Sequence, residues 1–273
     1  MKRSDRLIGI TNYFLDHPRT LVQLNYFAKR FEASKPSISE DLDIIHQMFQ
    51  HEGIGGLERV PGAAGGVRYI PNFSKESSRA FMETICDELQ DASRILPGGY
   101  LYMSDLLGDP TILKEVGKAF VTAFADKQID AVVTVETKGI PIAYAVANYL
   151  HVPVVIIRRN MRVTEGSSVS INYVSGRSQR IQTMVLPKRN LPEGKNVVII
   201  DDFMKAGGTI SGMKSLLEEF KATVVGIGVF AEAEDEDEDE SMIEEYTSLI
   251  KVSNVHVKKG QIDVQLGSFY DVN

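Results

Sequence analysis

The sequence has little of what secreted or membrane proteins use for stability. One residue of 273, Cys86, is cysteine, which excludes an internal disulfide and favours a reducing compartment. The longest apolar runs, 153–157 and 197–200, are strand-sized, far below the ~18 residues of a membrane span. The sequence has no cluster of cysteines and histidines that would predict a structural zinc site. Its first ten residues are basic but contain no long apolar stretch of the kind found in signal peptides. We therefore expect a cytoplasmic protein with no membrane partner and no metal site.

Charge is distributed unevenly along the chain. The whole chain has a net charge of −7, which argues against bulk attraction to nucleic acid. Residues 1–73 contain nine Lys/Arg and eight Asp/Glu, whereas the remaining 200 residues carry a net charge of −8. A glycine-rich stretch, 61–66, lies shortly before this change in composition. We therefore predict two domains, residues 1–73 and 74–273.

The first domain has the pattern of three helices and a hairpin. Leu7, Ile10, Phe14 and Leu15 line one face of the first predicted helix, and a second helix is predicted over 21–31. After a turn at Ser34-Lys35-Pro36, the third helix has its predicted buried positions at Ile38, Leu42, Ile45 and Phe49. Short strands are predicted at 57–60 and 67–70, around the glycine-rich loop. This order is the outline of a winged helix, in which the hairpin is the wing.

The second domain alternates between strands and helices. Strands are predicted at 131–135, 152–157, 197–200 and 223–229, and helices at 140–150 and 209–220. Two more strand-like runs, 252–257 and 262–266, close the chain, and residues 158–190 are long and polar. Such alternation predicts an α/β domain with a mostly parallel sheet and helices on its faces.

The segment from Val197 to Thr209 is the one that most clearly indicates a ligand-binding site. A buried strand runs into Asp201 and Asp202, a loop with Gly207 and Gly208 follows, and Thr209 opens a helix. Backbone N–H groups of such a loop, together with the helix N-terminus, make a phosphate cradle. Carboxylates at the end of a parallel strand are placed to accept hydrogen bonds from ribose hydroxyls.

This segment resembles the phosphoribosyl-pyrophosphate (PRPP) motif of type I phosphoribosyltransferases. The resemblance assigns Asp201 and Asp202 to the ribose hydroxyls and residues 206–209 to the 5′-phosphate. A second match is the turn 136–141, where Lys138 and Gly139 fit a basic-glycine turn that contacts pyrophosphate. Two departures are Lys205 and Ala206, where active enzymes usually place small or hydroxylated residues. The basic, serine-rich segment 158–190 corresponds to a closing loop.

A winged helix fused to such a domain resembles the purine operon repressors of Gram-positive bacteria. The resemblance implies a homodimeric repressor that binds double-stranded operator DNA, has no catalytic residues and is released by PRPP. The alarmone ppGpp is expected to compete in the same pocket and to favour repression, and Mg²⁺ is allowed as an accompanying ion but no resident cofactor is expected. The implied effector-binding residues are Tyr100, Thr137, Lys138, Gly139, Arg158, Asp201, Asp202, Phe203, Met204, Lys205, Ala206, Gly207, Gly208 and Thr209.

DNA contacts are expected from cations and hydroxyls of the first domain. Glu40, Asp41 and Asp43 make the third helix acidic near its start, so the N-terminal arm and the wing are favoured over direct base reading by that helix. The candidate residues are Lys2, Arg3, Arg6, Lys35, Ser37, Ser39, Arg59 and Arg68.

Three other interpretations stay open at this point. The chain would be a working purine phosphoribosyltransferase with an extra oligomerisation domain if it released pyrophosphate from PRPP and a purine base. It would be an RNA-binding attenuator if it preferred single-stranded RNA to duplex DNA. The three helices alone would also suit a dimerisation module.

Overall fold

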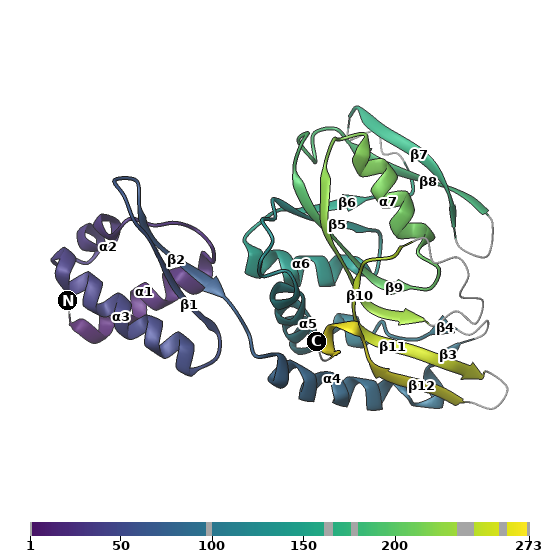
Figure 1. The fold of residues 1–273 in the computed structure, drawn as a ribbon, viewed down its shortest axis with the longest axis horizontal. Coiled ribbons are helices and arrows are strands. Elements are labelled where there is room, and N and C mark those ends of the chain that lie inside the picture. Colours follow the sequence, from purple (N-terminus) through teal and green to yellow (C-terminus); the bar gives the residue numbers. More distant parts are fainter. Residues whose placement is uncertain are drawn as a thin grey trace. The chain divides into compact units, whose positions relative to one another are not determined.

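The structure is a computed structural model that describes residues 2–96, 100–160, 166–175, 180–233, 243–256 and 261–271 (Figure 1). The chain divides into two compact units, residues 1–74 with 149–151, and residues 75–148 with 152–273. Within the described ranges, no helix is long and apolar enough to cross a membrane.

The N-terminal unit is a winged helix, as predicted. Its elements are α1 (Arg3–Asp16), α2 (Leu24–Arg30), α3 (Lys35–His51), β1 (Gly55–Val60) and β2 (Gly66–Pro71). The four predicted core positions of α3 are all buried, together with Ile10 and Phe14 of α1. Two predictions are wrong in detail. The second helix begins only at Leu24, because Val22 bridges Val67 of β2, and Leu15 is 47% exposed.

Local chemistry explains where α3 begins and how it holds the wing. The Ser34 Oγ caps the helix by accepting a hydrogen bond from the Ser37 N–H (3.3 Å), and Pro36 occupies the first turn, where no N–H is needed. At its far end, His46 Nδ1 accepts the Leu57 N–H (2.9 Å). The strands β1 and β2 pair antiparallel, with Leu57 opposite Tyr69. The helix and the wing are therefore joined by hydrogen bonds as well as by packing.

The C-terminal unit is built on a six-stranded sheet in the order β12-β11-β10-β9-β5-β6. All neighbouring pairs are parallel except β11–β12, so the predicted mostly parallel sheet is confirmed. The strands are β5 (Ala131–Val135), β6 (Val154–Ile157), β9 (Asn196–Met204), β10 (Thr223–Ala233), β11 (Thr247–His256) and β12 (Gln261–Leu266). The main helices are α4 (Lys75–Leu89), α5 (Pro110–Ala123), α6 (Gly139–Leu150) and α7 (Gly208–Glu218).

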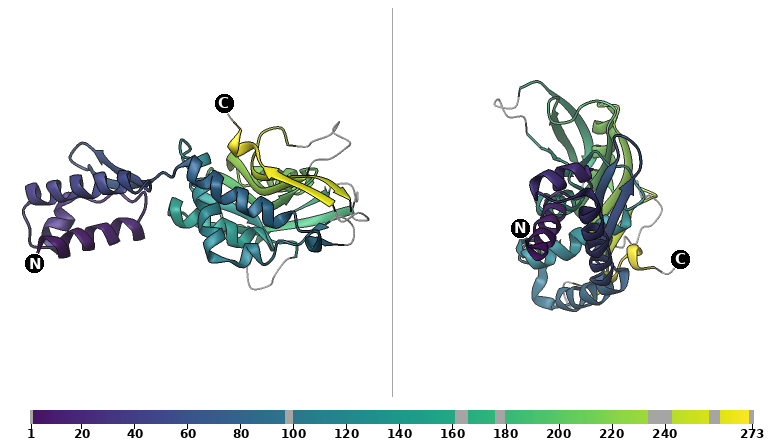
Figure 2. Two further views of the ribbon diagram at one scale, coloured as in Figure 1. Left: turned by 90° about the horizontal axis from the view of Figure 1, so that it is seen from below. Right: turned by 90° about the vertical axis from the view of Figure 1, so that its left-hand side faces the viewer.

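Helices cover both faces of this sheet, and Figure 2 shows the layers from two further sides. On one face, Ile210, Met213 and Leu217 of α7 enter a core with inward residues of β5, β6 and β9. On the other face, α5 lies so close to β10 that a Cβ on Gly228 would lie 2.6 Å from the Phe120 ring. The sequence did not reveal two smaller hairpins, β3–β4 (Ile95–Leu96, Tyr100–Leu101) and β7–β8 (Ser168–Ser175, Arg180–Pro187).

The hairpin β7–β8 corrects the prediction that 158–190 is a long polar loop. Its strands pair over eight residues, and Tyr173, Met184 and Leu186 are buried against α7. A Cβ on Gly212 of α7 would lie 2.8 Å from Tyr173, so glycine is required for this close contact. The strands were not predicted because polar residues alternate with the buried ones in this segment. The buried residues pack against α7, which lies far away in the chain.

Candidate effector-binding site

The acidic pair lies inside β9 and not after its end. Strand β9 continues to Met204, four residues beyond the predicted end, because β10 pairs with it as far as Glu232 opposite Met204. Asp201 stands opposite Val229 and is 4% exposed, and Asp202 is half-buried. The connecting loop therefore shrinks to residues 205–207, which makes the strand-to-helix turn very tight.

The second motif lies directly against the first. Strand β5 neighbours β9, and the turn after β5 brings Gly139, the first residue of α6, against Asp201. A Cβ on Gly139 would lie 3.1 Å from the Asp201 Oδ1 and closer still to Thr134, so only glycine fits. Thr137 and Lys138 are exposed in this turn, which begins with a cis peptide bond between Glu136 and Thr137. The structure thus brings the two predicted motifs together.

Burial dominates the electrostatics of the acidic pair. Desolvation raises the pKa of Asp201 well above its usual range, and the charge of Asp202 raises it further. Desolvation also raises the pKa of Asp202, whereas a hydrogen bond with Asp201 and the charges of Lys138 and Arg159 lower it. A ligand that donates hydroxyl groups to these carboxylates would replace the missing water.

Arg159 is a site residue that the sequence-based assignment left out. Its charge acts on both acids, and its backbone N–H donates to Glu136 Oε1 (2.8 Å). Its guanidinium donates to Gln182 Oε1 (3.2 Å) on the hairpin, which also accepts the Tyr173 hydroxyl (2.7 Å). The neighbouring Arg158, which was assigned, forms an ion pair with Glu136 (3.4 Å). Two arginines directly after a strand were the available signal, and only the fold shows that the charge of Arg159 acts on the acids.

The loop between β9 and α7 has the geometry of an anion cradle. Gly207 takes a left-handed conformation (φ 74°), and a Cβ there would lie 2.9 Å from Ile243. Glycine is therefore required both by the backbone conformation and by the close contact. Gly208 starts α7, whose first N–H groups lack intrahelical partners. Lys205 is exposed, and Ala206 and Thr209 are half-exposed beside it. The loop and the first turn of α7 therefore place an exposed cation and a half-exposed hydroxyl beside the N-terminus of the helix.

The other assigned residues have structural positions or lie outside the description. Phe203 and Met204 are strand residues of β9, and Met204 is buried. Tyr100 begins β4, but its side chain lies outside the described part of the chain, as do residues 234–242 of the acidic run. Among the described residues, no group of three or more His, Cys, Asp or Glu is arranged to hold a metal ion.

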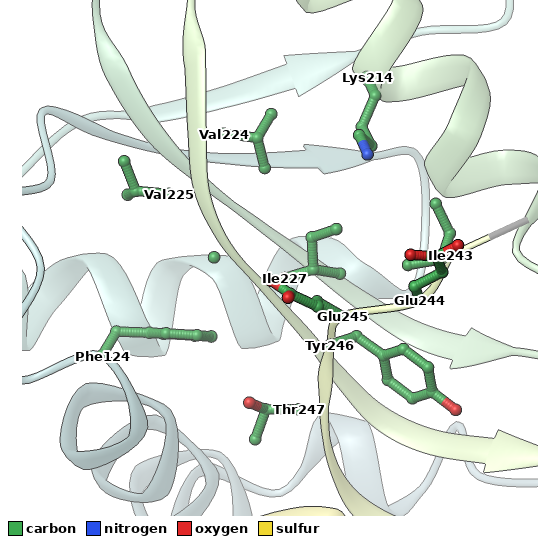
Figure 3. A pocket seen from close by; sticks show the side chains of 11 residues that line it. Phe124, Lys214, Val224, Val225, Ile227, Ile243, Glu244, Glu245, Tyr246 and Thr247 are labelled. Atoms are coloured by element: carbon green, nitrogen blue, oxygen red, sulfur yellow. The ribbon is translucent and has the colours of Figure 1, made fainter.

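A separate cavity of about 720 Å³ opens beside the first half of β10 (Figure 3). Lys214 of α7 and Glu244 and Glu245 bring charge to its lining, and Phe124 lies at the far side. Neither member of the acidic pair lines it, so it is distinct from the candidate site.

The candidate DNA-binding residues divide into two groups. Arg3 and Arg6 form ion pairs with the fully buried Asp41, Arg59 pairs with Asp43 (2.7 Å), and Arg68 pairs with Glu58 (2.8 Å). Ser39 accepts a hydrogen bond from Arg59 (3.1 Å), and Ser37 shares one with Ser34 (2.9 Å). In contrast, Lys2 and Lys35 are exposed and form no ion pair within the described ranges.

The fold defines a class: winged-helix proteins whose second domain is a phosphoribosyltransferase fold, here with a buried acidic pair beside a glycine loop. Two family models support this class. One, described as bacterial purine repressor, N-terminal, matches residues 2–71, and the other, the phosphoribosyl transferase domain, matches residues 103–261. An adenine phosphoribosyltransferase structure from Rhodothermus marinus shares the second fold, with a TM-score of 0.50, 22% identity, and coverage of 56% of this chain and 88% of that one.

Two curated relatives match almost the whole chain. The purine biosynthesis transcriptional repressor PurR of Bacillus subtilis is 56% identical over 268 residues, which are 98% of this chain and 93% of the relative. The purine biosynthesis transcriptional activator PurR of Lactococcus lactis is 45% identical over 271 residues, 99% of both chains. The chain therefore belongs to the family of purine biosynthesis transcriptional regulators, which are regulators and not enzymes.

Proposed function

We propose that this protein is a homodimeric, cytoplasmic repressor of purine biosynthesis genes that binds double-stranded operator DNA and is released by PRPP. The alarmone ppGpp competes for the same site and favours repression. A repressor is favoured over an activator because the relative named as a repressor is 56% identical, compared with 45% for the relative named as an activator.

The observation that carries the effector assignment is the juxtaposition of Asp201 and Asp202 with the loop 205–207. A ribose ring presents two neighbouring hydroxyls that can donate to two carboxylates, and its 5′-phosphate would reach the N-terminus of α7. Lys138 and Arg159 supply positive charge beside the acids, which suits a pyrophosphate. Mg²⁺ would accompany the pyrophosphate as a counterion and not as a resident cofactor.

Exposed cations of the winged helix, three at the turn between α2 and α3 and one before α1, support DNA binding. Lys29 lies in the last turn of α2, Lys35 opens α3, and Lys2 precedes α1; none of their ammonium groups has an ion pair in the described ranges. Arg30 also forms no ion pair with an acidic residue in the described ranges, although it donates a hydrogen bond to the Tyr26 hydroxyl (3.3 Å). These four residues replace the arm and wing arginines as the proposed phosphate contacts, since the arginines already neutralise acids of their own domain.

The test is fluorescence anisotropy of a labelled purine-operon promoter duplex titrated with protein, without and with PRPP. We expect tight, sequence-preferring binding that PRPP weakens and that excess ppGpp restores. The Asp201→Ala variant should bind the duplex normally but no longer respond to PRPP. An unchanged response would contradict the pocket assignment. Binding that PRPP strengthens would contradict repression and favour activation.

A further inference from the structure

A short C-terminal turn, η6 (Ser268–Tyr270), is fastened to the beginning of α4, the helix that follows the link to the winged helix. The Tyr270 hydroxyl shares a buried 2.6 Å hydrogen bond with Ser78, and burial raises the pKa of Tyr270 to about 12, so the hydroxyl stays protonated. Arg79 donates to the Tyr270 carbonyl and stacks over its ring. Lys75, the first residue of α4, donates to the Asp271 carbonyl (3.1 Å). A displacement of η6 would therefore displace the first turn of α4.

The other side of η6 is joined to β11 by a reciprocal pair of serines. The Ser248 N–H donates to Ser268 Oγ (3.0 Å), and the Ser268 N–H donates to Ser248 Oγ (2.9 Å). Ser248 is fully buried, and a Cβ on Gly267 would clash with it, so β11 and the residue before η6 are in close contact. Close packing of this kind transmits a displacement and does not absorb it.

The same serine reaches the strand beside the candidate effector site. Ser248 Oγ donates to Glu232 Oε1 (2.9 Å), and the Tyr246 hydroxyl donates to the other carboxylate oxygen of Glu232. Glu232 stands opposite Met204, the last residue of β9 before the loop 205–207. Hydrogen bonds and strand pairing thus run without a break from that loop, through Glu232, Ser248 and Ser268, to the first turns of α4.

We propose that this chain of contacts carries the effector signal: ligand bound at the loop shifts the ends of β9 and β10, and η6 passes that shift to α4. The inference rests on the proposed function, because it needs a ligand at the loop and DNA at the winged helix. The quantity it predicts is the coupling factor, the ratio of the DNA dissociation constants with and without saturating PRPP. Typical coupling factors are about 5–150-fold, large enough for a loss to be measured.

Two substitutions weaken the path without touching either binding site. Tyr270→Phe removes the buried hydrogen bond with Ser78 and leaves the contacts of Lys75 and Arg79 with backbone carbonyls of 270–271. Ser248→Ala removes the hydrogen bond to Glu232 and leaves the Ser248 N–H bonded to Ser268. The matched control is Asp263→Ala, which removes an exposed hydrogen bond from Asn254 (2.8 Å) between β11 and β12, away from the path.

The experiment measures DNA binding by anisotropy with and without saturating PRPP, and PRPP binding by calorimetry, for all four full-length proteins. We expect both path variants to bind PRPP and unliganded DNA within about twofold of wild type, with the coupling factor reduced at least about fivefold, the low end of usual couplings. Asp263→Ala should keep the wild-type factor. If Ser248→Ala fails to fold, Tyr270→Phe decides. Wild-type coupling in Tyr270→Phe would overturn the relay. A wild-type coupling factor of one would instead overturn the proposed function.

Discussion

Asp201 is a buried acid whose position lowers the stability of the protein without ligand. Its pKa is raised mainly because burial disfavours the charged form, and the neighbouring Asp202 adds to the effect. As pH rises above the ordinary aspartate pKa, the unfolded chain gives up this proton while the folded chain keeps it. The contribution of Asp201 to stability is therefore full in acid and is lost as pH rises through the raised pKa.

Replacement of this carboxyl should consequently stabilise the protein without ligand. We expect Asp201→Asn to raise the melting temperature at pH 7 by roughly 2–4 °C, the shift that about 1 kcal/mol produces in a domain of this size. The difference should shrink toward pH 4. Asp105→Asn is the control. A hydrogen bond from Arg94 lowers the pKa of Asp105, so this carboxylate stabilises the fold at pH 7 and its replacement should lower the melting temperature there. Parallel melting profiles for wild type and Asp201→Asn across this pH range would contradict the argument.

Among the elements, α1 and α3 are joined by a buried charge. Asp41 of α3 is fully buried and accepts from both Arg3 and Arg6, and the Arg6 side chain is only 13% exposed. Asp41→Asn should destabilise the winged helix by about 3 kcal/mol, since Arg6, whose side chain is mostly covered, loses the charged partner that neutralises it. Calorimetry of the domain transition measures this. Asp43→Asn, which breaks an exposed pair with Arg59, should cost under about 1 kcal/mol, and equal losses would be inconsistent with this account.

The α2–α3 turn and the wing make opposite predictions for DNA binding. Lys35→Ala should lower the slope of log affinity against log salt by about 1, because one phosphate contact is lost. Arg59→Ala should leave that slope nearly unchanged, since Arg59 already neutralises Asp43 and donates to Ser39. Anisotropy titrations across a salt series compare the two. A larger loss of slope in Arg59→Ala would restore the wing as the main phosphate contact.

For the whole molecule, the link between ligand and DNA must work in both directions. If PRPP weakens operator binding by a given factor, saturating operator DNA must weaken PRPP binding by the same factor. Calorimetric titration of PRPP into the free protein and into the protein–operator complex measures this factor directly. A nonspecific duplex of equal length is the control and should leave the PRPP affinity closer to that of the free protein. A PRPP affinity that saturating operator DNA leaves unchanged would contradict the proposal that PRPP releases the protein from its operator.

Much of the molecule was predictable because its signals are local in the chain. The core positions of α3 follow helical periodicity, the cap at Ser34 follows from its own side chain, and the buried strands of the parallel sheet are short apolar runs. The order strand, acidic pair, glycine loop and helix start also lies within thirteen consecutive residues, so the sequence alone indicated a candidate site there.

Tertiary structure decided what depends on partners far away in the sequence. The extension of β9 to Met204 requires pairing with β10, and the hairpin β7–β8 requires packing against α7. The ion pair that neutralises Arg6 requires Asp41, which is 35 residues distant. No local pattern shows which arginine acts on the acids through its charge or which cation is already neutralised by an ion pair. Backbone propensity and periodicity act over a few residues, whereas pairing, burial and charge neutralisation are settled only when the chain folds. The sequence by itself thus determined most of the elements and the residue types of the candidate site, and the fold determined which of those side chains are already paired within the protein.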